Sequence, residues 1–366
     1  MAAVTSKKPM DKLKRAPSII LALAIGGVGG YCFDLLGTPL PYMLGAMTAT
    51  MVASIAGAPL AMPRWLRNGL APVLGVLFGS LVQVSDLPAL GEIVLMAGLV
   101  MCHLLLTIGL GWLYFRWAGV DPVTSYFAAV PGNFSDMVML ADQLGANVRV
   151  VALVHSARLV IAVAAISFGL RYILGIDPVQ MVISEGPPPG LFDLAILAAS
   201  AVIGYGLGVL LRIPAPQMFG PLFVSVAIHA VGLTQSSPPH WAIAAAQVFL
   251  GVFAGVRFVG VRLDKVWRIL LFAVIWAFVL LGIVAAFAVV AGNLLDIHSS
   301  LPVMAFAPGG FAEISILSIA AGVSLAFVST VQLIRMLFTI FIGPMIIGAL
   351  VQRHQARNSI DPVEKI

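Results

Sequence analysis

Two short stretches of the sequence combine a proline, glycine and an acid in otherwise apolar surroundings. The first reads PGNFSD over residues 131–136, and the second reads PGGFAE over residues 308–313. We expect a short helix to begin at Phe134 and at Phe311, directly after the PGN and PGG tips. The backbone amides of each tip and the positive end of that helix favour a negative charge. The residue types therefore predict an anion or ion site in which Asp136 and Glu313 are the acids.

The candidate binding residues form two matching sets, each with a proline-glycine tip, an acid, and an arginine in the next apolar segment. His155 and Gln332 come three residues before the two arginines, hence on the same helical face, and are accessory candidates. The first set is Pro131, Gly132, Asn133, Ser135, Asp136 and Arg158, and the second is Pro308, Gly309, Gly310, Glu313 and Arg335.

The roles of the charged residues have two interpretations at this point. An arginine near the middle of a membrane span costs on the order of 2.5–3.5 kcal/mol, so it usually pairs with an acid or faces a cavity. Arg158 and Arg335 either form ion pairs with Asp136 and Glu313 or contact a bound anion. The two acids are either structural partners or the site of a proton or cation. A lone histidine in a span, such as His155, is more often a packing residue.

Metal, redox and covalent chemistry have no support in the residue pattern. The six histidines are scattered, and Cys32 and Cys102 both lie in apolar segments, which excludes a CxxC site and a disulfide framework. We therefore expect no catalytic residues, no metal and no cofactor, and we expect that the protein is not an enzyme.

The composition is that of an integral membrane protein. Of the 366 residues, 61% are hydrophobic and 10% are charged, against roughly 25% charged in a soluble domain. The net charge of +5 does not indicate nucleic acid, because five of the 20 basic residues precede the first apolar segment, where positive charge sets orientation. The lipid bilayer is thus the expected partner, and direct nucleic-acid binding is not expected.

The chain is duplicated. Residues 131–158 align without gaps with residues 308–335, and TPLPYMLGAM (38–47) matches IPAPQMFGPL (213–222). Glycines that recur in the first apolar segment are expected to let helices pack closely within the chain. Contact between two copies in a homodimer is the lesser alternative. The expected regions are a basic cytoplasmic N-terminus (1–16), a first membrane repeat (17–174), a polar linker (175–190), a second membrane repeat (191–351) and a cytoplasmic tail (352–366).

Each repeat contains six apolar segments, and the fifth segment, 122–145 or 299–323, carries the PGN or PGG tip. If all six crossed, the basic cluster at 262–268 would lie outside, against the positive-inside rule. If the fifth segment instead enters and returns on one side, the basic loops all lie inside. We therefore predict an all-α polytopic membrane protein with two inverted repeats of about five transmembrane helices, each with a re-entrant helical hairpin. For either copy alone, a helix ending in a loop is the alternative.

The doubled PGG-F-[SA]-[DE] segment, followed by a glycine and an arginine-bearing span, resembles the AbrB membrane-protein family of bacteria. The resemblance covers residues 17–350 and implies a duplicated AbrB domain, distantly similar to cation/proton antiporter and anion-symporter folds. Asn133 and Asp136 depart from the commoner glycine and glutamate. Family members are labelled as regulators of gene expression or as ammonia monooxygenases. Neither label fits these residues, because metal ligands and a basic soluble module are missing from the sequence.

These observations favour a secondary transporter in the bacterial inner membrane. It would move a small anionic solute, coupled to protons or a cation, with both termini in the cytoplasm. Asp136 and Glu313 would bind the coupling ion, the PGN and PGG backbones the solute, and Arg158 and Arg335 would supply positive charge. The alternative is a membrane-bound regulator or sensor that affects gene expression indirectly, without flux.

Overall fold

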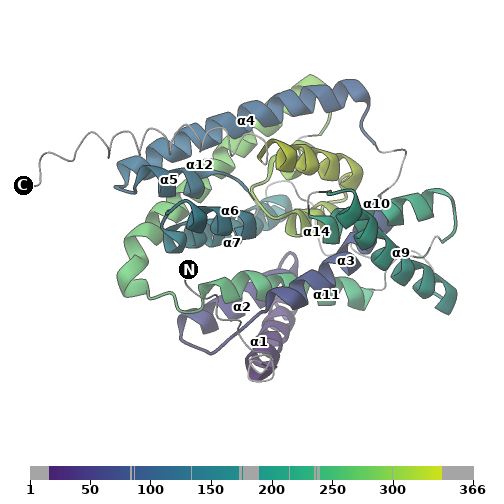
Figure 1. Ribbon diagram of the computed structural model, residues 1–366, viewed down its shortest axis with the longest axis horizontal. Coiled ribbons are helices and arrows are strands. Elements are labelled where there is room, and N and C mark those ends of the chain that lie inside the picture. The colour runs from purple at the N-terminus through teal and green to yellow at the C-terminus, as the bar shows by residue number, and fades with distance from the viewer. Residues whose placement is uncertain are drawn as a thin grey trace, which may run out of the picture.

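The computed structural model describes residues 16–339, apart from 83, 84, 86, 133, 173, 174, 176–188, 214, 235, 237–239 and 299. Throughout this part of the chain the regular elements are helices, and no strand occurs in it (Figure 1). The all-helical prediction is therefore confirmed.

The order of helices is the same in both halves of the chain. The first half contains α1 (Ala16–Leu35), α2 (Pro41–Ile55), α3 (Arg64–Leu81), α4 (Leu90–Trp117), α5 (Pro122–Ala129), α6 (Phe134–Gln143) and α7 (Val148–Tyr172). The second contains α9 (Leu191–Leu210), α10 (Pro216–Ala230), α11 (His240–Gly255) with the short 3-10 turn η4 (Val256–Phe258), α12 (Leu263–Leu295), α13 (Ser300–Phe306) and α14 (Phe311–Ala320). A further helix, Leu325–Thr339, is the last one in the described part of the chain and is called the last helix below.

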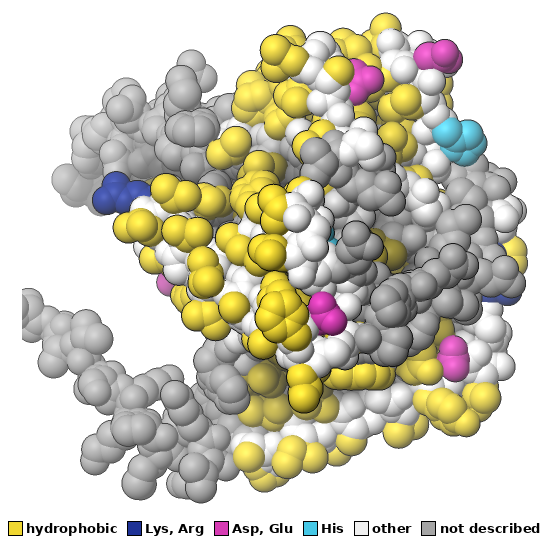
Figure 2. Space-filling model, turned by 90° about the vertical axis from the view of Figure 1, so that its right-hand side faces the viewer, with side chains coloured by type: hydrophobic (Ala, Val, Ile, Leu, Met, Phe, Trp, Pro, Cys, Tyr) yellow, Lys and Arg dark blue, Asp and Glu magenta, His cyan; other side chains and the backbone are white. Residues whose placement is uncertain are grey.

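Within the described residues, five helices are long and apolar enough to cross a membrane: α1, α4, α7, α9 and most of α12. Shorter apolar helices, among them α2 and the last helix, accompany them. Hydrophobic side chains also cover much of the face in Figure 2, where charged side chains are few. Large apolar side chains such as Leu191 and Val202 are more than 70% exposed. An apolar surface of this extent needs an apolar environment, as expected for a membrane protein.

The helices form two groups. The first helix group consists of α1–α3 and α9–α11, in which α2 packs against α1 and α11, and α10 packs against α9 and α3. The second helix group consists of α4–α7, α12–α14 and the last helix, with α12 packed along α7, α4 and α13. In Figure 1 the first group occupies the lower and right parts of the molecule, and α4 runs along the top. The groups meet where α11 contacts α7 and α14.

Glycines let the two halves of the chain approach each other closely within the first helix group. A Cβ at Gly75 of α3 would collide with the carbonyl oxygen of Met218 in α10. At the equivalent position in the second half, a Cβ at Gly251 of α11 would collide with the carbonyl oxygen of Met43 in α2. Small residues at such crossings allow backbone-to-backbone contact. The repeated motifs LGVLFGS (74–80) and LGVFAGV (250–256) therefore each pack closely against a helix of the other half.

The entries to α2 and α10 share an unusual backbone conformation. Leu40 and Ala215 both have φ of 47° and directly precede the first residue of their helices, Pro41 and Pro216. A left-handed conformation is costly for a residue with a Cβ, and persists where surrounding packing imposes it. Its occurrence at equivalent positions shows that the duplication extends to backbone geometry.

The fifth apolar segment of each half is broken, as the proline-glycine steps predict. One segment is divided into α5 and α6 and the other into α13 and α14. The helices after the breaks begin at Phe134 and Phe311, the residues predicted from the sequence. Proline lacks a backbone donor and interrupts the helical ladder, so each tip leaves backbone groups that need other partners.

Replacing Gly251 by valine is expected to lower the free energy of unfolding by at least about 1–3 kcal/mol, since the side chain would overlap the backbone of α2. The matched control is Gly282→Val in α12, where a Cβ meets no atom within 4 Å. The apparent melting temperature of detergent-purified protein measures the difference. Equal melting temperatures for the two variants would contradict the close crossing.

Candidate functional site

A cavity of about 220 Å³ lies between the two helix groups. Both proline-glycine tips line it, together with α7, α14 and the last helix on one side and α10 and α11 on the other. The site residues expected from the sequence that line it are Pro131, Gly132, Arg158, Pro308, Gly309, Gly310, Glu313 and Arg335, with the accessory residues His155 and Gln332. Segments separated by nearly two hundred residues are thus brought to one place.

For three expected site residues the structure does not describe the side chain. Asn133 is not among the described residues, and the side chains of Ser135 and Asp136 lie outside the description as well. The hypotheses attached to these three residues stay predictions.

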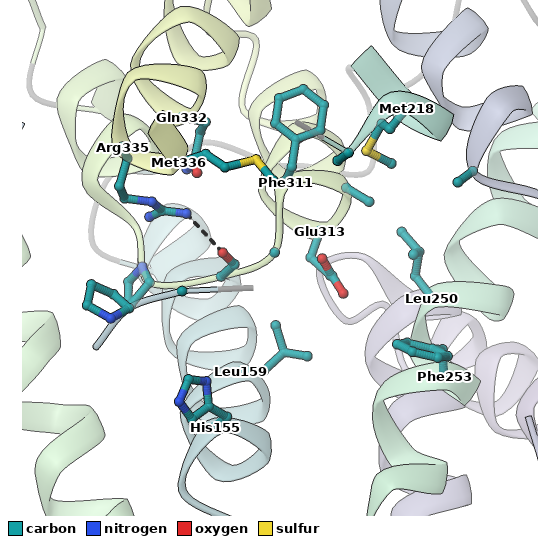
Figure 3. Close-up of a pocket in the computed structure, with 18 of the residues that line it drawn as sticks. His155, Leu159, Met218, Leu250, Phe253, Phe311, Glu313, Gln332, Arg335 and Met336 are labelled. Atoms are coloured by element: carbon teal, nitrogen blue, oxygen red, sulfur yellow. Dashed lines mark hydrogen bonds between the residues drawn. The ribbon is translucent and has the colours of Figure 1, made fainter. Parts of the chain in front are cut away.

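Arg335 donates hydrogen bonds to backbone carbonyls at the break in the fifth apolar segment of the second half. Its Nη1 donates to the carbonyl oxygen of Ala307 at 2.6 Å, and its Nη2 donates to that of Gly309 at 3.1 Å (Figure 3). The carbonyl of Ala307 directly follows α13 and also accepts from the amide of Gly309 at 3.0 Å, whereas the carbonyl of Gly309 belongs to the tip. The guanidinium satisfies them and places its charge at the negative end of the helix.

Arg158 makes the same contact in the first half. Its Nη1 donates to the carbonyl oxygen of Val130 at 3.2 Å, and Val130 is the residue equivalent to Ala307. Its Nη2 lies 3.1 Å from Nδ1 of His155. Because a guanidinium can only donate, Nδ1 accepts, and the proton of His155 is on Nε2, which donates to the carbonyl oxygen of Phe127 at 2.8 Å. His155 is therefore a neutral bridge between Arg158 and α5.

Gln332 occupies the position of His155 in the second half and contacts the backbone of α13 alone. Its Nε2 lies 3.4 Å from the carbonyl oxygens of both Met304 and Ala305, and Met304 is equivalent to Phe127. The accessory residues expected from the sequence therefore contact the backbone of the broken helices. The arginine contact is symmetric, but only His155 also binds its arginine, and Gln332 binds backbone carbonyls alone.

The carboxylate of Glu313 points into the cavity (Figure 3). Glu313 lies in the first turn of α14 and is 7% exposed. Among the described residues it forms no ion pair with Arg335, whose guanidinium donates to backbone carbonyls instead. The ion-pair interpretation is thus wrong for this half, because the arginine is engaged by the helix end.

Arg257 is a lining residue that the sequence analysis did not identify. It lies in η4, and its guanidinium carbon is 4.8 Å from the centre of the Phe253 ring. The signal was present in the repeat itself. LGVLFGSL and LGVFAGVR align, so that Arg257 stands opposite Leu81. A basic residue in an otherwise apolar match indicates a candidate site residue. The sequence analysis also did not identify the apolar residues that line the cavity beside Arg257.

Replacing Arg335 by methionine is expected to remove the charged donor to the carbonyl oxygens of Ala307 and Gly309, and a hydrogen bond to a charged group is worth about 1.5–3 kcal/mol. Amides of α13 and of the tip should then exchange hydrogen faster, as mass spectrometry can measure. Arg262→Met is the control, because Arg262 is exposed and pairs with Asp264. Unchanged exchange in the Arg335 variant would contradict the holding role of this guanidinium.

Comparison with known proteins gives two similar chains. One, "Uncharacterized protein YhjN" of Bacillus subtilis (strain 168), is 27% identical over 347 residues, covering 88% of this chain and 90% of the relative. The other, "Putative regulator AbrB" of Escherichia coli (strain K12), is 26% identical over 313 residues, covering 84% of this chain and 89% of the relative.

The family profile described as "Transition state regulatory protein AbrB" matches residues 42–351. This range includes both broken segments and both arginines, so the resemblance expected from the doubled tip is confirmed. The chain belongs to the AbrB family.

Proposed function

We propose that this protein is a secondary transporter of the bacterial inner membrane, which moves a small anionic solute coupled to protons or a cation. The observation that carries the proposal is the meeting of two broken helices at one cavity between two helix groups. Broken helices at equivalent positions of two repeats are the usual construction of the binding site in secondary transporters.

The charge of the lining favours an anion. Arg158, Arg257 and Arg335 all line the cavity, and Glu313 is the one acid among the lining side chains that the structure describes. The amides that open α14 add partial positive charge. An anion entering from water therefore exchanges its hydration for fixed donors and positive charge, which supports an anionic solute.

The chemistry of Glu313 supports a coupling role. A buried carboxylate is costly unless a proton, a cation or a hydrogen-bond donor compensates its charge. Glu313 is buried and faces the cavity, and no hydrogen bond or ion pair joins it to another described residue. A proton or cation that binds here is released when the site opens to the other side, which couples its movement to that of the solute. Asp136 has the equivalent role in the first half.

The proposed topology has five crossings in each repeat. The broken segments are re-entrant hairpins, the second repeat is inverted relative to the first, and both termini lie in the cytoplasm. Its support is the distribution of basic residues together with equivalent breaks in two halves of the same helix order. Movement of one helix group against the other would expose the cavity alternately to each side.

A membrane-bound regulator without flux is the second candidate. The name of the Escherichia coli relative, "Putative regulator AbrB", favours this candidate. The two candidates differ in one observation. If a transport-inactive Asp136→Asn, Glu313→Gln double variant restores the transcript levels altered by deletion of the gene, the regulatory function does not need flux.

Replacing Glu313 by glutamine is expected to abolish proton- or cation-driven uptake in proteoliposomes, because the neutral amide cannot release a proton or bind a cation by charge. Glu92→Gln is the matched control, since Glu92 is exposed and accepts from the amide of Ala89. Gradient-driven flux of the purified protein is the measurement, and undiminished coupled uptake in the Glu313 variant would refute the assignment.

A cysteine introduced at Glu185 in the linker is expected to react with a membrane-impermeant maleimide from the periplasmic side, because five crossings place the linker outside. Cys32 and Cys102, both free and exposed, are first replaced by serine. A cysteine at Arg357 in the tail is the control and should react only after permeabilisation. Labelling of position 185 from the cytoplasm would overturn the inverted topology.

A further inference from the structure

The cavity has two chemically different sides. In Figure 3, Arg335 and Gln332 lie on one side, Leu250, Phe253 and Met218 lie on the opposite side, and the Glu313 carboxylate lies between them. Leu159 and Phe311 extend the apolar lining. A solute that fills this space must present charge at one end and apolar surface at the other.

Three arginines, Arg158, Arg257 and Arg335, line the same cavity of about 220 Å³. Their like charges therefore lie near one another. In a site with little water such repulsion is strong, and one bound anion between the guanidinium groups lowers it. The crowding of like charges therefore indicates where a negative group binds.

An unpartnered donor lies on the same side. Nε of Arg158 is buried without a hydrogen-bond partner among the described residues, and the residue is 6% exposed. Such a buried donor is costly unless an acceptor reaches it. The nearby helix α14 has ten residues, and its first intrahelical bond runs from the amide of Ile314 to the carbonyl of Gly310. The preceding amides of its first turn are thus open to an acceptor.

The apolar side limits the charge that the solute can carry. A second carboxylate placed against Leu250 and Met218, whose side chains have no donor, would lose its hydration, which is unfavourable. An aliphatic or aromatic group in the same position gains free energy by leaving water. The cavity volume of about 220 Å³ lies below the range of about 300–1,000 Å³ for pockets that take drug-sized ligands.

We propose that the solute is a small monocarboxylate with an apolar body, bound with its carboxylate towards Arg158 and Arg335 and its body against Phe253, Leu250 and Met218. This assignment rests on the proposed transport function and specifies its substrate class. Arg257, stacked on Phe253, lies where the charged and apolar sides meet and helps to hold the carboxylate.

The first test measures binding to the purified full-length protein by isothermal titration calorimetry and thermal shift. Isovalerate, benzoate and phenylacetate are the probes, and succinate, citrate and neutral phenylacetamide are the comparisons. We expect the monocarboxylates to bind and to raise the melting temperature, with phenylacetamide at least about tenfold weaker because it cannot use the arginine charge. Preference for succinate or citrate, or equal binding of the amide, would overturn the proposal.

The second test assigns the two ends of the solute to the two sides of the cavity. Arg257→Gln should weaken phenylacetate binding roughly 10- to 100-fold, whereas the exposed Arg262→Gln should leave it unchanged. Phe253→Ala should weaken phenylacetate about tenfold but acetate little. Phe278→Ala, at an outward-facing position 58% exposed, is its control. If Arg257→Gln fails to fold, Arg257→Lys replaces it, and unchanged affinity in these variants contradicts the binding mode.

Flux and binding together separate this assignment from the transport function. Radiolabelled benzoate uptake into proteoliposomes under an imposed proton gradient is compared with binding of the same probe. Binding without uptake would support the substrate class and refute transport. Uptake of succinate with no binding of monocarboxylates would support transport and refute the class. Absence of both binding and uptake for every anion tested would refute both.

Discussion

Backbone carbonyls at the ends of two interrupted helices are the constraint on which the cavity depends. Where α5 and α13 stop, the carbonyls of Val130 and Ala307 each accept one tip amide, at 2.9 and 3.0 Å, and each keeps a second lone pair that needs a donor in apolar surroundings. Arg158 and Arg335 satisfy them from the following helices. Each tip is thereby held at a fixed place beside the first helix group, and the cavity is the space between these tips and α10 and α11.

The two halves of the chain make equivalent backbone contacts but carry different side chains around them. Glycines of α3 and α11 contact equivalent carbonyls of the opposite half, and the arginines contact equivalent carbonyls of the breaks. The supporting residues differ, because His155 stands where the second half has Gln332, and Arg257 where the first half has Leu81. Symmetry therefore builds the framework, and departures from it give the cavity its charged and apolar sides.

The arginines show how one residue combines a structural and a binding role. A guanidinium has five N–H donors in a fixed plane, and helix ends use only some of them. The contacts of Arg158 with Val130 and His155 leave its Nε without a described partner. An arginine fixed in this way presents its remaining donors without further loss of conformational freedom, so the group that stabilises the break is also preorganised for an anion.

The sequence by itself determined the helical membrane character, the duplication, the breaks and the first residues of α6 and α14. These follow from chain-local physics: apolar length, the missing proline donor and the start of a new hydrogen-bonded turn. It also selected ten described residues that line one cavity. Only the tertiary structure decided that Arg335 contacts carbonyls and not Glu313, and that Arg257 and Phe253 belong to the site. Those partners depend on how helices distant in sequence pack, and spacing along one chain does not encode the distance between them.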